Sequence, residues 1–168
     1  SSYNDNRSAA AFPYYAMIRL MGHLPQAERV HPSLLIENVK RLYLVLPERM
    51  PSEIGRFSEL EELVVARNGL VFLPGKIGDL KNLRVLSLND NNLTELPPAL
   101  ANLDKLRHLG LSDNSISELP DWIGGLTELR ILDLVRNRIR KLPSAIGELA
   151  NLQFLGLRSN KLTALPPE

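Results

Sequence analysis

The chain contains 168 residues, of which 44% are hydrophobic and 23% are charged, and its formal net charge at pH 7 is +1. This apolar content excludes an intrinsically disordered chain, and the absence of cysteine excludes a disulfide-stabilised scaffold. A charge so close to zero gives no bulk electrostatic argument for binding nucleic acid or an anionic membrane. No apolar run approaches the roughly 20 residues that a membrane-spanning helix needs. The unusual feature is leucine, which supplies 34 of the 168 residues.

Residues 1–38 carry no repeat and are predicted to form a polar tail followed by two helices. The polar stretch 1–8 is expected to fray. Pro13 begins a helix whose apolar residues have the spacing of one helical face, and Pro25 ends it. Those apolar residues are Met17, Leu20, Met21 and Leu24. A second short helix begins at Ser33, a good N-cap residue, and leads into the first strand.

Residues 39–59 are interpreted as a degenerate first repeat. Val39, Leu42 and Leu44 have the spacing of the strand positions in the units that follow. The unit is two residues shorter than the later ones, and Pro47 stands near the place where they carry asparagine. We therefore expect a strand here that does not extend the asparagine series.

From Leu60 onward the same chemical sequence returns every 23 residues. Four full units cover residues 60–151, and a partial unit covers residues 152–168. Apolar residues stand three and five positions after each opening leucine, and a Leu-Pro pair begins thirteen positions after it. Every unit also carries an asparagine eight positions after its opening leucine: Asn68, Asn91, Asn114, Asn137 and Asn160.

This pattern, L-x-x-L-x-L-x-x-N-x-L-x-x-L-P-x-x-I-x-x-L, resembles that of the leucine-rich repeat family, whose known periods include 23 residues. The resemblance covers residues 39–168, about three quarters of the chain. Its Leu-Pro-x-x-Ile-Gly variant resembles the intracellular class of Ras-pathway scaffolds and of Scribble- and Erbin-type polarity proteins. Bacterial and plant proteins with the same consensus are equally similar.

The resemblance implies an α/β solenoid: a right-handed curved array with a parallel concave sheet and an irregular or short-helical convex side. Residues 1–38 would then be a polar tail and an N-terminal helical cap over the open end of the core, because terminal units of a solenoid need covering. A partner-binding amphipathic helix is the alternative for this segment. Caps of secreted leucine-rich repeat proteins usually carry paired cysteines. Their absence favours an intracellular, cytoplasmic location, and a secreted bacterial effector is the alternative.

The repeated residues have predicted structural roles. In each strand the leucines point to one face and build a continuous core between stacked units. Each asparagine stands where the chain leaves its strand, so its amide can donate to and accept from backbone groups of adjacent turns. On the convex side, Gly55, Gly78, Gly124 and Gly147 are expected to permit tight bends.

Ligand contacts in this architecture come from the concave face, which is formed by the residues between the strand leucines. These positions vary while the leucines do not, so we expect any specificity to lie there. Apolar side chains stand beside charges, as in protein interfaces, whereas a solvated face without a partner is the alternative. The candidate protein-binding residues are Val85, Ser87, Asp90, His108, Ser112, Asp113, Ile131, Asp133, Val135, Arg136, Phe154 and Arg158.

The sequence predicts neither an enzyme active site nor a metal site in this segment. Ser87, His108 and Asp133 are the residue types of an acyl-transfer triad on neighbouring predicted strands. An open sheet offers no water-excluding pocket and no evident oxyanion donors for them. One histidine with Asp113 and Asp133 is a weak metal-ligand set. No motif for a cofactor occurs in the sequence, and no cofactor is predicted.

The sequence therefore predicts a protein-protein interaction module that binds an unidentified partner protein through its concave face, as part of a longer signalling or scaffold protein. The alternative is a substrate-targeting domain of a bacterial effector or other multidomain enzyme whose catalytic part lies outside this chain. Neither nucleic acid nor membrane insertion is expected.

Two further expectations concern the ends and the charge. The chain stops within a unit at Glu168, so we expect it to continue in the natural protein or to associate end to end with another copy. Residues 83–128 contain three basic and seven acidic residues, whereas residues 129–168 contain seven basic and three acidic ones. This charge gradient favours a charged protein partner.

Overall fold

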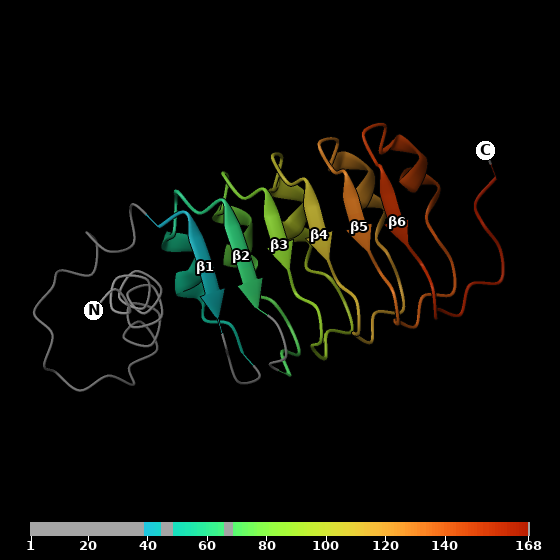
Figure 1. Cartoon of the computed structure of the whole chain (residues 1–168), viewed down its shortest axis with the longest axis horizontal. Helices are drawn as coiled ribbons and strands as arrows, with labels where there is room; N and C mark the ends of the chain where they lie inside the picture. The colour runs from blue at the N-terminus through green and yellow to red at the C-terminus, as the bar shows by residue number, and fades with distance from the viewer. Residues whose placement is uncertain (1–38, 45–48, 66–68, 168) are drawn as a thin grey trace, which may run out of the picture.

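The structure, a computed structural model, describes residues 39–44, 49–65 and 69–167. The predicted helices and cap of residues 1–38 lie outside these ranges, as does Asn68. The described part contains six strands that form one parallel sheet in sequence order (Figure 1). They are β1 (Arg41–Leu44), β2 (Glu62–Val65), β3 (Val85–Ser87), β4 (His108–Gly110), β5 (Ile131–Asp133) and β6 (Phe154–Gly156).

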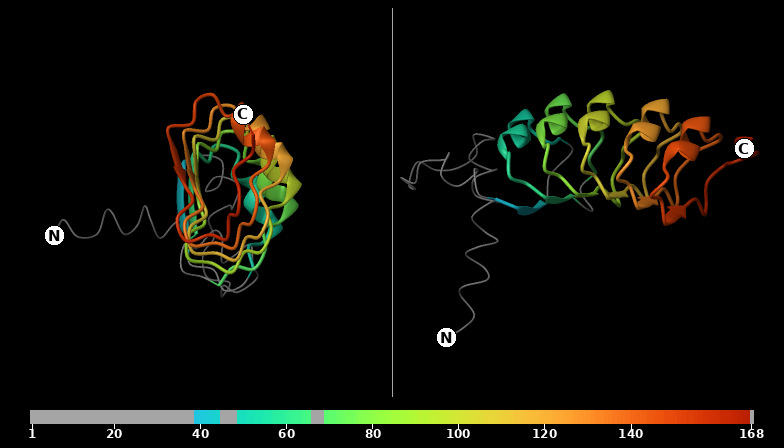
Figure 2. Two further views of the ribbon diagram at one scale, coloured as in Figure 1. Left: turned by 90° about the vertical axis from the view of Figure 1, so that its right-hand side faces the viewer. Right: turned by 90° about the horizontal axis from the view of Figure 1, so that it is seen from above.

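Short 3-10 helices form the opposite layer of the array. Each begins directly after a proline whose φ lies between −71° and −68°, which is the value that the pyrrolidine ring imposes. The helices are η1 (Ser52–Arg56), η2 (Gly75–Asp79), η3 (Pro98–Asn102), η4 (Asp121–Gly125) and η5 (Ser144–Glu148). Figure 2 shows the sheet along one side of the curved array and the helices along the other. The predicted solenoid with a parallel sheet and a short-helical convex side is confirmed.

The register of the sheet follows the repeat. From β2 to β6 each leucine pairs with the leucine 23 residues later, as Leu86 does with Leu109. Between β1 and β2 the offset is 21 residues, because Leu42 pairs with Leu63. The two residues missing from the first unit are therefore absent from its turns and not from its strand. The paired leucines of β2 to β5 are fully buried between sheet and helices.

The asparagines bond the turns of adjacent units. The Asn114 amide nitrogen donates to the carbonyl oxygens of Leu88 and Leu111, at 2.9 and 3.1 Å. Its side-chain oxygen accepts from the Leu93 backbone nitrogen at 3.0 Å. Asn91 and Asn137 make the same contacts one unit earlier and one unit later, and all three are buried. Backbone groups that would otherwise be buried without partners are thus satisfied.

The convex glycines have a different role from the predicted one. None of them adopts a positive φ; the described glycine that does is Gly69, in the turn after β2. A Cβ atom on Gly78 would lie 2.7 Å from the carbonyl oxygen of Ala99, and one on Gly124 equally close to that of Ala145. These glycines therefore permit the close approach of the next helix rather than a bend.

The unit that lacks this glycine packs differently. Ala101 takes the glycine position in η3. Trp122 in η4 takes the position that Ala99 and Ala145 hold in their own helices, opposite the glycine of the helix before. The packing between η3 and η4 is looser than between the other neighbouring helices. Trp122 is half-buried and packs against the core, which is the role expected for a large side chain at a widened helix contact.

Candidate protein-binding face

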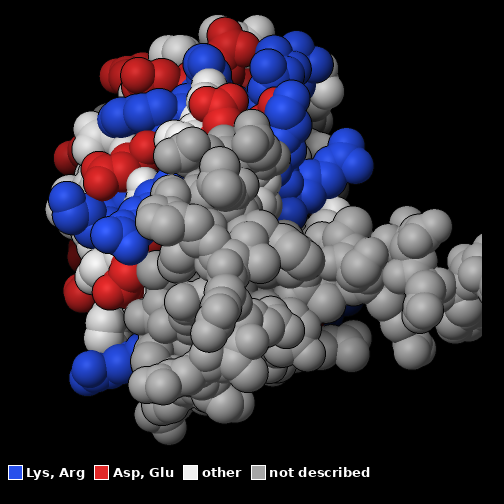
Figure 3. Space-filling view, turned by 90° about the vertical axis from the view of Figure 1, so that its left-hand side faces the viewer, with Lys and Arg blue, Asp and Glu red and all other residues white. Residues whose placement is uncertain are grey.

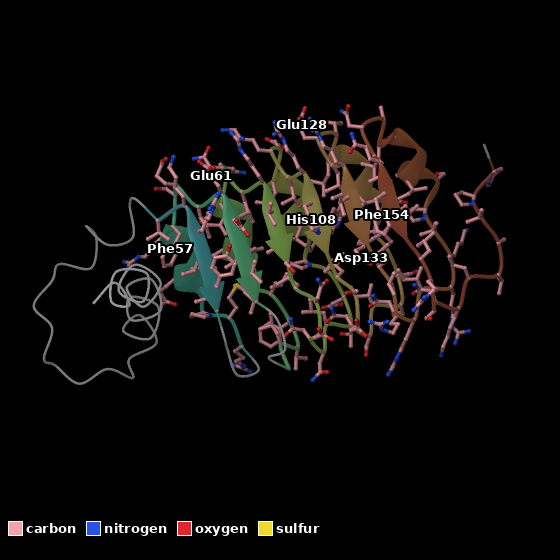
Figure 4. The ribbon with its side chains drawn as sticks, in the orientation of Figure 1. Phe57, Glu61, His108, Glu128, Asp133 and Phe154 are labelled. Atoms are coloured by element: carbon pink, nitrogen blue, oxygen red, sulfur yellow. The ribbon has the colours of Figure 1, made fainter. Side chains whose placement is uncertain are left out.

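The concave face carries two rows of side chains that cross the strands. The first row comes from the first residue of each strand from β3 to β6, and neighbouring members stand in register, about 4.8 Å apart. Its members are Val85, His108, Ile131 and Phe154 (Figure 4). The first three are half-buried by their neighbours, whereas the Phe154 side chain is 51% exposed. The row therefore offers a mostly apolar strip with one protruding aromatic ring.

The second row, two residues further along the strands, alternates side chains with glycines. Ser87 and Asp133 flank Gly110, and Asp133 also borders Gly156. A Cβ atom on Gly110 would lie 3.0 Å from the side-chain oxygen of Asn89, and one on Gly156 would lie 2.8 Å from the Asp133 carboxylate. The glycines thus leave room for polar side chains of adjacent strands to lean across the sheet.

Asn89 also belongs to this face, although it is not among the predicted protein-binding residues. Its amide nitrogen donates to the Ser87 hydroxyl at 3.2 Å, and its side-chain oxygen accepts from the backbone nitrogen of Ser112 at 2.9 Å. It therefore fixes the position of two predicted face residues. The signal was present in the sequence, because Asn89 lies one residue after a strand leucine in the same column as Ser112 and Val135.

The acidic candidates gather around Arg136. Both guanidinium branches of Arg136 bond the Asp113 carboxylate: Nε bonds Oδ1, and Nη2 donates to Oδ2 at 2.7 Å. The Arg136 bond lowers the pKa of Asp113 below its usual range, although desolvation opposes the shift. Asp90 and Asp133 also favour the charged form of Arg136 and raise its pKa. Arg158, whose backbone oxygen accepts from the Arg136 backbone nitrogen, is exposed and adds a second positive charge. Three carboxylates and two guanidinium groups leave an excess of one negative charge at this part of the face.

Three of these charged residues have a left-handed backbone conformation. Asp90, Asp113 and Arg136 precede the asparagines of their units and have φ between 52° and 57°, in the left-handed region. Such a backbone redirects the side chain where the chain leaves the strand, and only glycine, asparagine and aspartate adopt it at low cost. Elsewhere, charged side chains of both signs are mixed over the surface seen from the β1 end (Figure 3).

The same two rows continue onto β1 and β2, beyond the predicted site. The Tyr43 hydroxyl donates to the Glu62 carboxylate at 2.9 Å, and Arg41 lies 3.4 Å from the same carboxylate. The hydrogen bond to Glu62 raises the pKa of Tyr43, because ionisation would break it. The Tyr43 side chain is 58% exposed, so it adds a second protruding aromatic ring to the face.

The residues of the possible triad have other hydrogen-bond partners. Ser87 accepts from Asn89, and the Asp133 carboxylate accepts from the Val135 backbone nitrogen at 3.1 Å. His108 stands in the first row, whereas the other two stand in the second, on either side of Gly110. Among the described residues no hydrogen bond joins His108 to either of them, and no group of three or more potential metal ligands occurs.

Comparisons with known proteins agree with the fold. A leucine-rich repeat family matches residues 58–116, and a leucine-rich repeat region family matches residues 98–167. The chain is a leucine-rich repeat protein. A search of curated proteins found no match. No helix in the described ranges is long and apolar enough to cross a membrane.

Solved structures extend the likeness. The leucine-rich repeat protein LIC12759 of Leptospira interrogans is 33% identical over 79% of this chain, with a TM-score of 0.73. The plant peptide hormone receptor RGFR1, solved in complex with RGF2, is 30% identical over 73% of the chain, with a TM-score of 0.66. PEPR1, solved with AtPEP1, is 26% identical over 75% of the chain, with a TM-score of 0.67. The chain spans about a third of the Leptospira protein and about a fifth of RGFR1 and of PEPR1.

Proposed function

We propose that this chain binds a partner protein or peptide through its concave face. Leucine-rich repeat proteins are commonly protein-protein interaction modules and are typically non-enzymatic. The observation that carries the proposal is the acidic excess formed by Asp90, Asp113 and Asp133 around Arg136, at the end of the strands opposite to the apolar first row. An apolar strip and an acidic cluster on the same face match a partner that presents an apolar side chain at one place and basic side chains at another.

The mechanism is rigid presentation. The leucine core and the buried asparagine bonds hold each strand in place, so the side chains of the face are ordered before a partner arrives. A preordered surface loses little conformational entropy on binding, and more of the contact energy therefore appears as affinity. The likeness to RGFR1 and PEPR1, both solved as complexes, supports a ligand on this architecture.

The wider setting is also part of the proposal. We propose that residues 39–168 belong to one repeat domain of a longer cytoplasmic signalling or scaffold protein of the Leu-Pro-x-x-Ile-Gly class; the tail and helical cap expected for residues 1–38 lie outside the described residues. The alternative is a targeting domain of a bacterial effector with a catalytic part elsewhere. The likeness to a Leptospira protein supports bacterial and eukaryotic settings about equally, because plant receptors are almost as similar.

The test removes one charge and one apolar contact from the face. The double variant Asp90→Asn and Phe154→Ala should weaken binding to a partner captured with the full-length protein and then purified. Both side chains are exposed, so the melting curve should stay nearly unchanged. The control, Asp121→Asn with Thr127→Ala, also removes one charge and shortens one exposed side chain to alanine, but at residues outside the concave face. Equal losses in both variants would contradict the concave assignment.

A further inference from the structure

Three arginines stand in register at the edge of the sheet where the strands begin. Arg84, Arg107 and Arg130 each follow the opening leucine of their unit and directly precede β3, β4 and β5. The Arg107 backbone nitrogen donates to the Arg84 carbonyl at 2.8 Å, and Arg130 donates to Arg107 at the same distance. All three are exposed. We call this column the arginine ladder; in Figure 4 it lies along the edge marked by Glu61 and Glu128.

The ladder lacks the charge pairing found one unit earlier in the same column. There Lys40 and Glu61 form an ion pair of 3.4 Å across β1 and β2. The three arginines form no ion pair among the described residues. Like charges directly opposite on neighbouring strands destabilise a sheet. The ladder is therefore a local cost of the fold that an anionic partner would relieve.

The turns before the strands add to this positive charge. The Lys105 ammonium donates to the Asn82 side-chain oxygen at 2.7 Å, and the Lys81 ammonium donates to the Asn102 carbonyl oxygen at 3.1 Å. Both lysines are thus held at the same edge. Segments 81–84, 104–107 and 127–130 together contain five basic residues and two acidic ones, Asp104 and Glu128. The edge therefore carries a net positive charge over these three units, whereas the preceding segment contributes the acidic residues Glu59 and Glu61.

The geometry points to an acidic α-helix as the partner: we propose that the arginine ladder binds the carboxylates along one face of such a helix, laid across the strands. Neighbouring strands lie about 4.8 Å apart, so the three arginines span about 9.6 Å. Two turns of an α-helix rise about 10.8 Å, and carboxylates one turn apart match this span to within about 1.2 Å.

Other shapes fit less closely. In an extended peptide, side chains on one face repeat about every 6.8 Å, so three of them span about 13.6 Å and exceed the ladder by about 4 Å. Arginine favours carboxylates because its guanidinium forms two parallel hydrogen bonds with them. This surface is the sheet edge and not the concave face, so the inference stands independently of the function proposed above.

The experiment measures binding of the full chain to synthetic peptides by fluorescence anisotropy. The probe is an alanine-based helical peptide with glutamates at successive i, i+4 and i+7 positions on one face. A control peptide has the same composition and helicity, with its glutamates spread around the helix. The protein variant Arg84→Gln, Arg107→Gln, Arg130→Gln removes the ladder. The control variant Arg56→Gln, Arg138→Gln, Arg140→Gln removes as many exposed arginines from other surfaces.

The striped peptide should bind the unmodified chain and the control variant alike. Loss of three exposed charge contacts should weaken its binding to the ladder variant roughly tenfold to a hundredfold. The ladder variant should melt no lower than the unmodified chain, so misfolding would not explain the loss. Equal binding of the two peptides, equal loss in both protein variants, or tighter competition by heparin or single-stranded DNA than by the striped peptide would each overturn the proposal.

Discussion

The interior repeats and the final described repeat share one sequence framework but differ in burial. Leu109 in β4 is fully buried, whereas Leu155, at the same position in β6, is only partly buried. Ile123 in η4 is fully buried and Ile146 in η5 is not. The comparison teaches that the unit that follows contributes part of the cover over each leucine in this fold. Burial is therefore a property of neighbouring pairs of units.

The largest expected effect is on the core leucines. Leu109→Ala should lower the free energy of unfolding by about 3 kcal/mol, because it removes a fully buried side chain and leaves a cavity. Leu155→Ala should cost only about 1 kcal/mol, because solvent already reaches that site. Urea unfolding followed by circular dichroism measures both. Equal costs would show that the final unit is as well covered as the interior ones.

The asparagines should show a smaller difference of the same kind. Asn114→Ala leaves the buried Leu93 backbone nitrogen without its partner and should cost about 2 kcal/mol. The Leu88 and Leu111 carbonyl oxygens lose one bond each but still accept from Asn91 and Asn137. Asn160→Ala should cost about 1 kcal/mol, because Asn160 is only half-buried and water can replace its bonds. Hydrogen exchange of the Leu93 and Ile139 amides, which donate to these two asparagines, reports each loss separately.

The convex glycines should give effects of opposite sign. Gly124→Ala places a Cβ atom 2.7 Å from the Ala145 carbonyl oxygen, and the resulting shift of η5 should cost about 1 kcal/mol. Gly147→Ala meets nothing within 4 Å and should stabilise the chain by about 0.5 kcal/mol, because alanine restricts the unfolded state. Melting temperatures of the two variants test this. A destabilised Gly147→Ala variant would contradict the idea that a convex glycine is needed only where the next helix packs against it.

The smallest effect concerns an exposed contact between the segments that follow β4 and β5. Because Arg136 lowers the pKa of Asp113 in the folded state, their pair stabilises the fold above the ordinary aspartate pKa of about 3.9. This contribution is lost as the pH falls through the lowered value. The urea midpoints of Asp113→Asn and the unmodified chain should differ slightly near neutral pH and converge in acid. Asp104→Asn, at an exposed carboxylate without an ion pair in the described part, is the control.

The sequence predicts the framework well because the 23-residue period encodes it directly. Leucine spacing identifies the strands and the buried face, and proline marks the start of each convex helix. The role of the glycines could not be read from one unit, since Gly78 is required by Ala99 of the next. Whether a glycine bends its own chain or admits a neighbour depends on the distance between units, and the period does not give that distance.

The candidate face is predicted less completely. The columns between leucines locate His108, Asp133 and Phe154 on the sheet, but the Asp113–Arg136 pair depends on a left-handed backbone that residue type does not indicate at arginine. The 23-residue period also places the arginines of the arginine ladder in one column, so their register could be predicted from the sequence. These arginines directly precede the strands, so they lie outside the columns between the strand leucines.

The spacing of the asparagine bonds has a consequence for how the chain folds. These bonds join residues 21 or 26 positions apart between units, and the strand pairs join residues 21 or 23 apart. Every such contact therefore closes a loop of about one repeat, however many units the array contains. Since the entropy of closure depends on loop length, each added unit meets the same kinetic barrier as the one before it. Structure can then begin at any adjacent pair of units and spread outward one unit at a time.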